Sequence, residues 1–225
     1  MENNMKKTIT GVVIVVILAA AAILTFEFLK QNKKDKMIST DKKAVEIIEK
    51  FPNDKGLQKV SALKELNALG LYNTKISDAG LAHLKKLPNL NSLILSQTKI
   101  SDAGLVHLKG LSKLSIISLD KTKISDAGLI HLKGLKKLTL LSLTGTQVSD
   151  AGLVHIKGLT GLTSLGLGGT KISDVGLVHL KGLTKLTRLE IYNTNTTKAE
   201  VAKLQKSLPK CYIQHFSSKK KANKN

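Results

Sequence analysis

The stretch Thr122-Lys-Ile-Ser-Asp-Ala-Gly-Leu-Ile-His-Leu132 sets the organisation of this chain, because nearly the same residues recur at a fixed interval. The copies begin at Thr74, Thr98, Thr122, Thr146 and Thr170, and the pattern decays after Thr194. The period is 24 residues, with no insertion between copies. A fixed period of this length is typical of a protein built from stacked copies of one small unit.

Each copy contains the pattern of two structural elements. The first has alternating apolar residues, Leu93 and Leu95 in one copy, which predict a short strand with one buried face. The second has leucines every three residues, at Leu105, Leu108 and Leu111, which predict a helical segment with one inward stripe. One unit cannot bury these side chains alone, so the units must stack.

The helical segments also have sequence signals at both ends. Ser101 is a candidate N-cap, and Asp102 suits the positive end of the helix dipole. A glycine follows each helix, and we expect a left-handed C-cap at Gly110, Gly134, Gly158 and Gly182. Because identical Ser-Asp pairs recur in every copy, we interpret them as caps and not as parts of a hydrolase triad.

The spacing Leu-x-x-Leu-x-Leu, seen at Leu114, Ile117 and Leu119, resembles that of leucine-rich repeat proteins. The resemblance covers residues 57–213, and residues 204–213 are similar to the closing cap of bacterial membrane-anchored repeat proteins. It implies an α/β fold, a curved solenoid with a parallel sheet on the concave face and helices on the convex face. The pattern is specific for the fold and not for the function.

A transmembrane anchor is predicted over residues 8–29, because residues 8–26 contain no charge and about 20 apolar residues span a bilayer. A cleaved signal peptide is the alternative, since residues 1–7 are basic and small residues follow at 19–22. The apolar run continues beyond that site and favours an uncleaved anchor. The lysines after the span favour a cytoplasmic repeat domain, whereas the resemblance to anchored bacterial proteins implies an extracytoplasmic one, which we expect.

The rest of the chain divides around the repeats. We expect an N-terminal tail (1–7), the anchor (8–29), a polar linker (30–39), an N-terminal cap with a helix over 41–51 (40–59), the repeats (60–193), a C-terminal cap (194–216) and a disordered basic tail (217–225). In the C-terminal cap, Thr197 and Glu200 form a capping box. Cys211 and Ile213 are predicted to point inward from a last edge strand, so the lone cysteine is interpreted as a buried residue.

Two polar residues recur in register and need an interpretation. The histidines are His83, His107, His131, His155 and His179. They could bind a metal or sense pH, but we interpret them as packing residues because the pattern supplies no carboxylate or thiolate beside them. The threonines that open each copy are predicted to satisfy backbone groups at a turn. We expect no metal, no cofactor and no enzyme activity.

The chain is strongly basic, with 36 Lys and Arg against 16 Asp and Glu and a net charge of +20. This charge is large enough to attract polyanions or anionic lipid headgroups. Specific nucleic-acid binding is not expected, because aromatic residues make up 3% of the chain and cannot form a stacking platform.

A protein partner is predicted to bind the outward strand positions of the concave face, because these differ from copy to copy. Ile94, Ile116 and Leu140 are expected to form an exposed apolar patch there. The other residues predicted to contact a partner are Tyr72, Ser92, Ser118, Asp120, Lys121, Ser142, Ser164, Arg188, Glu190 and Tyr192. The sequence therefore predicts a membrane-anchored binding or scaffolding module.

Overall fold

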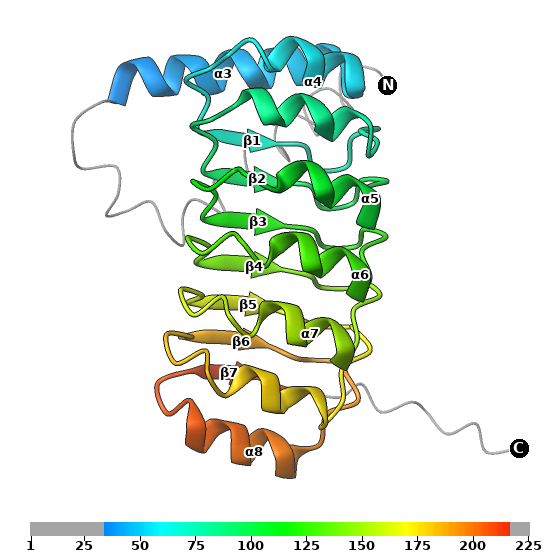
Figure 1. Ribbon diagram of the computed structural model, residues 1–225, viewed down its shortest axis with the longest axis vertical. Coiled ribbons are helices and arrows are strands. Elements are labelled where there is room, and N and C mark those ends of the chain that lie inside the picture. The colour runs from blue at the N-terminus through cyan, green and yellow to red at the C-terminus, as the bar shows by residue number, and fades with distance from the viewer. Residues whose placement is uncertain (1–33, 217–225) are drawn as a thin grey trace, which may run out of the picture.

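The computed structural model describes residues 34–216, with side chains from residue 41 onward. Seven short parallel strands form one sheet in chain order, and helical segments cover one of its faces (Figure 1). The strands are β1 (Ala68–Gly70), β2 (Ser92–Ile94), β3 (Ile116–Ser118), β4 (Leu140–Ser142), β5 (Ser164–Gly166), β6 (Arg188–Glu190) and β7 (Tyr212–Gln214). We call the side covered by helices the helix face and the opposite side the sheet face.

Helical segments connect the strands and also cap the two ends of the stack (Figure 1). The α-helices are α3 (Lys34–Lys50), α4 (Asp54–Val60), α5 (Asp102–Leu105), α6 (Asp126–Leu129), α7 (Asp150–Ile156) and α8 (Lys198–Ser207). The 3-10 segments are η1 (Gly80–Lys86), η2 (Val106–Leu108), η3 (Ile130–Leu132) and η4 (Gly176–Leu180). The predicted solenoid with a parallel sheet is confirmed.

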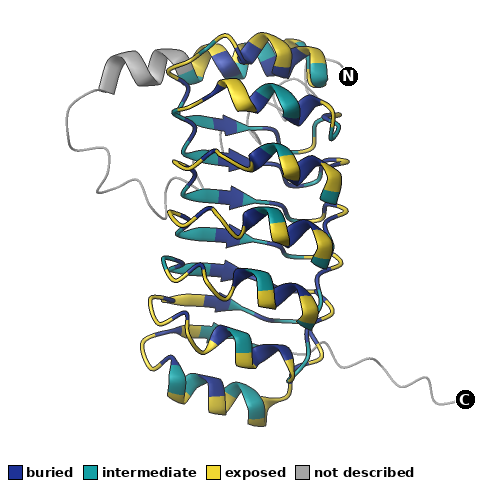
Figure 2. Ribbon diagram, viewed as in Figure 1, coloured by how far each residue is buried: buried dark blue, intermediate teal, exposed yellow. Residues whose placement is uncertain are grey.

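The strand register reproduces the period of the sequence. Leu93 lies opposite Ile117, and Leu141 lies opposite Leu165, so each residue pairs with its equivalent one copy later. Equivalent positions therefore form straight columns along the stack. The inward columns form one continuous core of leucine and isoleucine, shown in dark blue in Figure 2. Stacking the units removes this apolar surface from water, and that burial is the main force that holds the fold together.

The threonines that open the copies also form a buried column. Thr98 Oγ1 donates a hydrogen bond to the Leu95 carbonyl at 2.7 Å, and Thr122 Oγ1 donates to the Leu119 carbonyl at 2.6 Å. Equivalent bonds are made in the other copies. Each hydroxyl satisfies a carbonyl at the turn after the strand, so the predicted structural role of this column is confirmed.

The predicted left-handed glycine caps are wrong at three of four positions. Gly110 has φ +98°, but Gly134, Gly158 and Gly182 do not have positive φ. The helical segments before these three end with a lysine in the right-handed region, for example Lys133 at φ −50° and ψ −33°. The chain leaves these segments through a tight 3-10 turn, which needs no left-handed residue.

The N-terminal cap is longer than predicted. Helix α3 begins at Lys34, so residues 34–39 of the predicted linker are helical. No Gly or Pro interrupts residues 34–50, and lysine, methionine and alanine favour a helix, which explains the extension. Helix α3 ends at Lys50, just before Pro52 and close to the predicted end at residue 51, and a second helix, α4, follows. Asn53 caps α4, with its side chain accepting a hydrogen bond from Lys55 N at 3.1 Å.

Helix α3 also covers the first edge of the sheet. Asp41 Oδ1 lies 3.4 Å from Asn67 N and 3.5 Å from Ala68 N, and accepts hydrogen bonds from both. Burial raises the pKa of Asp41, and the two backbone hydrogen bonds oppose that shift. An edge strand with open backbone groups can pair with other chains, so this contact protects β1.

The C-terminal cap follows the prediction in part. The capping box is only half formed, because Thr197 N donates to Asp174 Oδ1 and the Glu200 carboxylate pairs with Lys203. Thr197 Oγ1 accepts a hydrogen bond from Glu200 N at 3.3 Å at the start of α8. Cys211 is buried, Ile213 is half-buried, and Tyr212 between them is exposed. Burial raises the pKa of the Cys211 thiol. The predicted structural role of this cysteine is therefore supported by its position.

Within residues 34–216 no helix combines the length and apolar character needed to cross a bilayer. The predicted tail (1–7), the anchor (8–29), residues 30–33 of the linker and the basic tail (217–225) lie outside the described residues.

Candidate functional site

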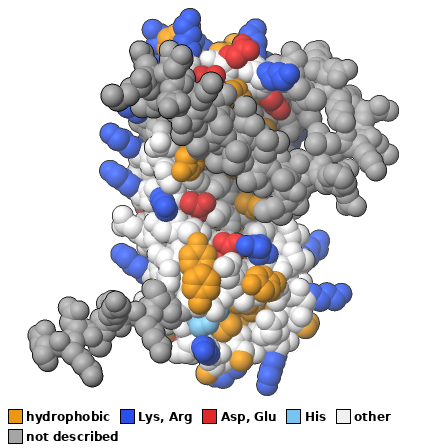
Figure 3. Space-filling model, turned by 180° about the vertical axis from the view of Figure 1, so that it is seen from behind, with side chains coloured by type: hydrophobic (Ala, Val, Ile, Leu, Met, Phe, Trp, Pro, Cys, Tyr) orange, Lys and Arg blue, Asp and Glu red, His pale blue; other side chains and the backbone are white. Residues whose placement is uncertain are grey.

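The sheet face is hollowed into a groove with a volume of about 390 Å³. Figure 3 shows this side of the molecule, with hydrophobic side chains between acidic and basic ones. The groove crosses several strands, from β2 to β6, and is lined by Tyr72, Ile94, Ser96, Gln97, Ser118, Asp120, Lys121, Leu140, Ser142, Thr144, Glu190 and Tyr192.

The structure brings together most of the residues predicted to contact a partner. Ser92, Ile116, Ser164 and Arg188 lie on the same strands but do not line the groove. Ser96, Gln97 and Thr144 line it and were not among the predicted residues. Alternation along the strand would have found Ser96 and Thr144, whereas Gln97 lies beyond the strand in the turn.

The predicted apolar patch is smaller than expected. Ile94 is only 5% exposed, so the expectation of an exposed side chain there is wrong. Ile94 is on β2, which is flanked by β1 and β3, and side chains on neighbouring strands are about 5 Å apart, so its side chain has neighbours on both sides. Ile116 and Leu140 are half-buried and lie opposite each other in the register of β3 and β4.

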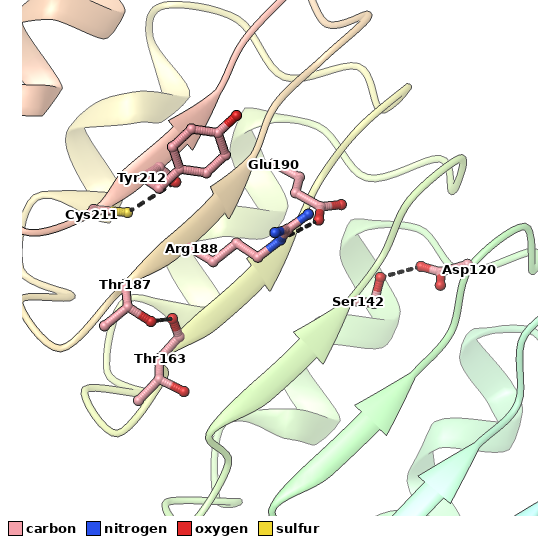
Figure 4. A network of polar contacts seen from close by, with 8 residues as sticks. All are labelled: Asp120, Ser142, Thr163, Thr187, Arg188, Glu190, Cys211 and Tyr212. Carbon is pink, nitrogen blue, oxygen red and sulfur yellow. Dashed lines mark hydrogen bonds and ion pairs between the residues drawn. The ribbon is translucent and has the colours of Figure 1, made fainter. Parts of the chain in front are cut away.

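Asp120 is the centre of a hydrogen-bond network on the sheet face. Its Oδ2 accepts from Ser118 Oγ at 3.0 Å, and its Oδ1 accepts from Thr144 N at 2.9 Å and from Ser142 Oγ. Figure 4 shows the contact with Ser142. The network also reaches Ser96, whose Oγ lies 2.6 Å from Ser118 Oγ. Asp120 therefore links three strands and holds this part of the groove rigid.

One rim of the groove is made of residues with left-handed backbone. Gln97 has φ +59° and Lys121 has φ +53°, and both residues line the groove. The equivalent residues in other copies are Asn73, Asn193, Gly145 and Gly169, types that adopt this conformation more easily. Each left-handed residue holds its N–H toward the next strand, as in the bond from Lys121 N to the Thr144 carbonyl at 2.8 Å. Gln97 and Lys121 are thus strained positions at the candidate site.

The C-terminal end of the groove is aromatic. Tyr192 stacks on Phe216 with ring centroids 5.2 Å apart and planes inclined by 10°. A Cβ built at Gly168 would overlap the Tyr192 ring, so only glycine leaves room for the ring there. Beside it, Arg188 Nε lies 2.7 Å from Glu190 Oε1 in a solvent-accessible ion pair, also visible in Figure 4. Large aromatic groups next to a charged pair are common at protein interfaces.

The recurring histidines lie half-buried on the helix face. Within the described residues no group of His, Cys, Asp or Glu has the arrangement of a metal site. His107 Nδ1 is buried without a hydrogen-bond partner, and burial, followed by the charge of Lys85, lowers the pKa of this side chain. A neutral imidazole packed against its neighbours agrees with the interpretation of these residues as packing residues.

The recurring Ser-Asp pair has a different role from the predicted N-cap. Ser101 makes no side-chain capping bond to its own helix. Instead, Asp78 of the preceding copy accepts from Ser101 N at 2.8 Å and from Ser101 Oγ at 2.5 Å. The same pair of bonds joins every copy to the next, from Asp54 with Ser77 to Asp174 with Thr197. We call each such pair an inter-repeat clamp.

The glycine of the repeated word belongs to this clamp. A Cβ built at Gly104 would overlap Asp78 Oδ1, and one built at Gly128 would overlap Asp102 Oδ1. The motif Ser-Asp-Ala-Gly is therefore explained by the junction between two units, because the aspartate of one unit lies against the glycine of the next. The recurrence is visible in the sequence, but the local pattern predicts an N-cap within one helix and not a contact between two units.

Comparison with known proteins found similarity at the level of structure. The chain matches no protein-family description and no curated protein sequence. An internalin (inlF) from Listeria monocytogenes superposes with a TM-score of 0.59 and 27% identity, over 71% of this chain and 50% of that protein. Internalin C2 (inlC2) from the same organism gives a TM-score of 0.58 and 24% identity, over 73% of this chain and 76% of that protein.

A leucine-rich repeat protein from Leptospira interrogans aligns over 70% of this chain and 50% of that protein, at 20% identity and a TM-score of 0.48. The chain spans about half the length of the internalin inlF. The superposition on the two internalin structures agrees with the architecture of this chain, a seven-stranded parallel sheet in continuous register. The chain has the leucine-rich repeat fold.

Proposed function

We propose that this chain is a membrane-anchored, non-enzymatic module that binds a protein partner in the groove of the sheet face. The main support for this proposal is that the groove lies on the sheet face, where the outward residues differ from copy to copy. Along one outward column the residues are Gly70, Ile94, Ser118, Ser142, Gly166 and Glu190. Recognition of a specific partner needs such differences, and a solenoid offers them on an extended surface.

The contents of the groove support a protein partner. Leu140 and the two tyrosines supply apolar contact area, and Lys121, Asp120 and Glu190 supply charges of both signs around it. A protein interface typically has an apolar and aromatic centre with a polar rim. The network around Asp120 holds the groove before any partner arrives, which lowers the entropy lost on binding.

A photoreactive residue at Lys121 in the full chain, expressed in its own cells, would capture and identify the partner. The affinity of that partner is then compared for the wild type, Leu140→Asp and Ile130→Asp. Burying an aliphatic side chain contributes about 1.5–3 kcal/mol, so Leu140→Asp should weaken binding at least about tenfold. Ile130 is exposed on the helix face and gives the matched control, which should bind as the wild type does.

The opposite pattern, in which Ile130→Asp loses the partner and Leu140→Asp retains it with both proteins folded, would move the binding surface to the helix face. The anchor is tested separately by alkaline carbonate extraction of membranes. The full chain should stay in the pellet at its unprocessed mass. Release, or a mass that matches cleavage after residue 22, contradicts the anchor. Protease protection of the repeats in sealed cells tests the extracytoplasmic location.

A second candidate is binding of a polyanion, an envelope polymer or anionic lipid through surface lysines. It is favoured by the excess of 36 basic over 16 acidic residues. Binding through many lysines releases counterions and should weaken steeply as salt rises, whereas binding in the groove should respond far less. The affinity of the captured partner at low and high salt distinguishes the two candidates.

A further inference from the structure

Three columns of exposed side chains run along the helix face. In one unit they are Ala103, Val106 and Lys109, three residues apart along the same helical segment. Residues at this spacing lie next to one another on a helix surface. The equivalent residues in the following units are Ala127, Ile130 and Lys133, then Ala151, Val154 and Lys157, then Val175, Val178 and Lys181. We call these twelve residues the helix-face band.

The aliphatic part of this band is in contact with water. Val106 is 42% exposed, Ile130 51%, Val154 40% and Val178 52%, and Val175 is 72% exposed. Figure 2 shows exposed residues recurring along the stacked helical segments. Single exposed aliphatic residues are ordinary on protein surfaces, but a row of them in successive units concentrates aliphatic surface on one face, and exposed apolar patches mark contact surfaces.

The band is bordered by positive charge. The lysine column at one end of the band is exposed, at Lys109, Lys133, Lys157 and Lys181. Further exposed lysines precede the helical segments, at Lys75, Lys99, Lys123 and Lys171. Among the described residues the only ion pairs are Arg188 with Glu190 and Lys203 with Glu200, so these lysines have no acidic partner. The aspartates nearest in sequence, such as Asp102 and Asp126, already accept hydrogen bonds in the clamps.

We propose that the helix-face band lies on the surface of a bilayer that contains anionic lipid. Aliphatic side chains bordered by lysines are the composition of surfaces that rest at the membrane interface, where the aliphatic groups enter the headgroup region and the lysines reach the phosphates. A soluble polyanion would use the lysines but leave the aliphatic column in water. A bilayer is therefore the ligand that accounts for both the aliphatic columns and the lysine column.

The inference rests on the membrane anchor of the proposed function, because the anchor would bring the band to the surface. Only residues 30–33 separate the predicted anchor from α3, and four residues span at most about 14 Å. With the helix face on the membrane, the groove on the sheet face stays open to a protein partner. The two surfaces therefore serve different ligands at the same time.

A fluorescent label placed at Ile130→Cys or at Leu140→Cys, with Cys211→Ala in both, tests this orientation. The full chains are reconstituted into phosphatidylcholine vesicles, with or without about one-third phosphatidylglycerol, and quenched with acrylamide from the water. We expect the label at 130 to be protected only in the anionic vesicles, and the label at 140 to be quenched equally in both. Equal quenching at the two positions in anionic vesicles would refute the proposal.

Two variants separate charge from aliphatic contact. Replacing Lys109, Lys133 and Lys157 by Gln should shift the docking equilibrium roughly 100-fold toward the undocked state. Replacing Val106 and Val154 by Ser leaves the charge unchanged and should also remove the protection at position 130. Full protection in this second variant, or the same protection by polyphosphate in solution, would instead assign the band to a polyanion.

Carbonate extraction of the same vesicles reports on the anchor independently. If the chain is extracted, the anchor has failed, and docking is then measured by cosedimentation with the same vesicles. Retention of the chain without protection at position 130 would overturn docking alone. The two failures are therefore distinguishable.

Discussion

The two faces of the solenoid differ in how strictly they repeat. On the helix face every junction carries the same clamp, from Asp54 with Ser77 to Asp174 with Thr197. On the sheet face the outward residues change from strand to strand, and no other copy has an aspartate at the position of Asp120, the centre of the network there. The helix face repeats because every unit must attach to the next there, whereas the sheet face is free to vary because the core and the backbone ladder already join the strands.

The largest effect is expected from breaking a clamp. Asp102→Ala removes the acceptor for Ser125 N and Ser125 Oγ, at 2.8 Å and 2.5 Å. Hydrogen bonds to a charged group contribute about 1.5–3 kcal/mol each, and this site is only half-buried, so the free energy of unfolding should fall by about 2–4 kcal/mol. Urea denaturation followed by circular dichroism measures it.

A double-mutant cycle with Gly128→Ala sharpens this test. In the wild type the new Cβ would overlap Asp102 Oδ1, so Gly128→Ala alone should destabilise the protein by about 1–3 kcal/mol. In the Asp102→Ala background that overlap is gone, and alanine favours the helix by about 1 kcal/mol over glycine. The second change should then be neutral or stabilising. Simple additivity of the two costs would contradict the clamp as described.

A smaller effect is expected on the sheet face. Asp120→Ala removes the contacts with Ser142 and with Thr144 N, but the site borders an open groove where water can replace them. We expect a loss of about 1 kcal/mol in the free energy of unfolding, clearly less than for Asp102→Ala. A loss as large as that of Asp102→Ala would remove the distinction between the two faces.

A substitution at the rim of the groove is expected to stabilise the protein, in contrast to the preceding ones. Lys121 has left-handed backbone at φ +53°, and the equivalent residues in the next two copies are glycines. Lys121→Gly should relieve about 1–2 kcal/mol of strain and lose about 0.5–1 kcal/mol through the more flexible unfolded chain. The net result is a gain of up to about 1.5 kcal/mol, measurable as a higher midpoint of thermal unfolding. Thr144→Gly, which relieves no such strain, serves as the contrast and should not stabilise.

The smallest effect on the free energy of unfolding is expected from Asp41, which lies on neither face, and this effect depends on pH. Burial raises the pKa of Asp41 above its ordinary value of 3.8, so the folded state binds this proton more tightly than the unfolded state. The resulting stability is present below pH 3.8 and is lost as the pH rises through the raised pKa. Asp41→Asn keeps an acceptor for Asn67 N and does not titrate. Its stability relative to the wild type should therefore increase across that pH range and level off above it, as followed by urea denaturation at several pH values.

The exact 24-residue period determined the fold from the sequence alone. It predicted the strand at Leu93 and the structural role of the Thr98 column, because a strict repeat forces equivalent residues into columns with the same environment. The hydrogen bond from Glu200 N to Thr197 Oγ1 could also be predicted, since it depends on residues three positions apart. Local patterns of this kind need no knowledge of the neighbouring units. The other half of the predicted capping box is not formed, because Thr197 N donates to Asp174 of the preceding unit.

Only the tertiary structure decided what happens between units. Ser101 looks like the cap of its own helix in the sequence, but its partner is Asp78 of the preceding copy, and no local pattern distinguishes the two. Ile94 alternates as an outward residue, yet it is only 5% exposed in the folded chain. In a solenoid one sequence position meets the copies on both sides of it, so the repeated word fixes each unit, while the packing of neighbours decides which atoms bond and which remain exposed.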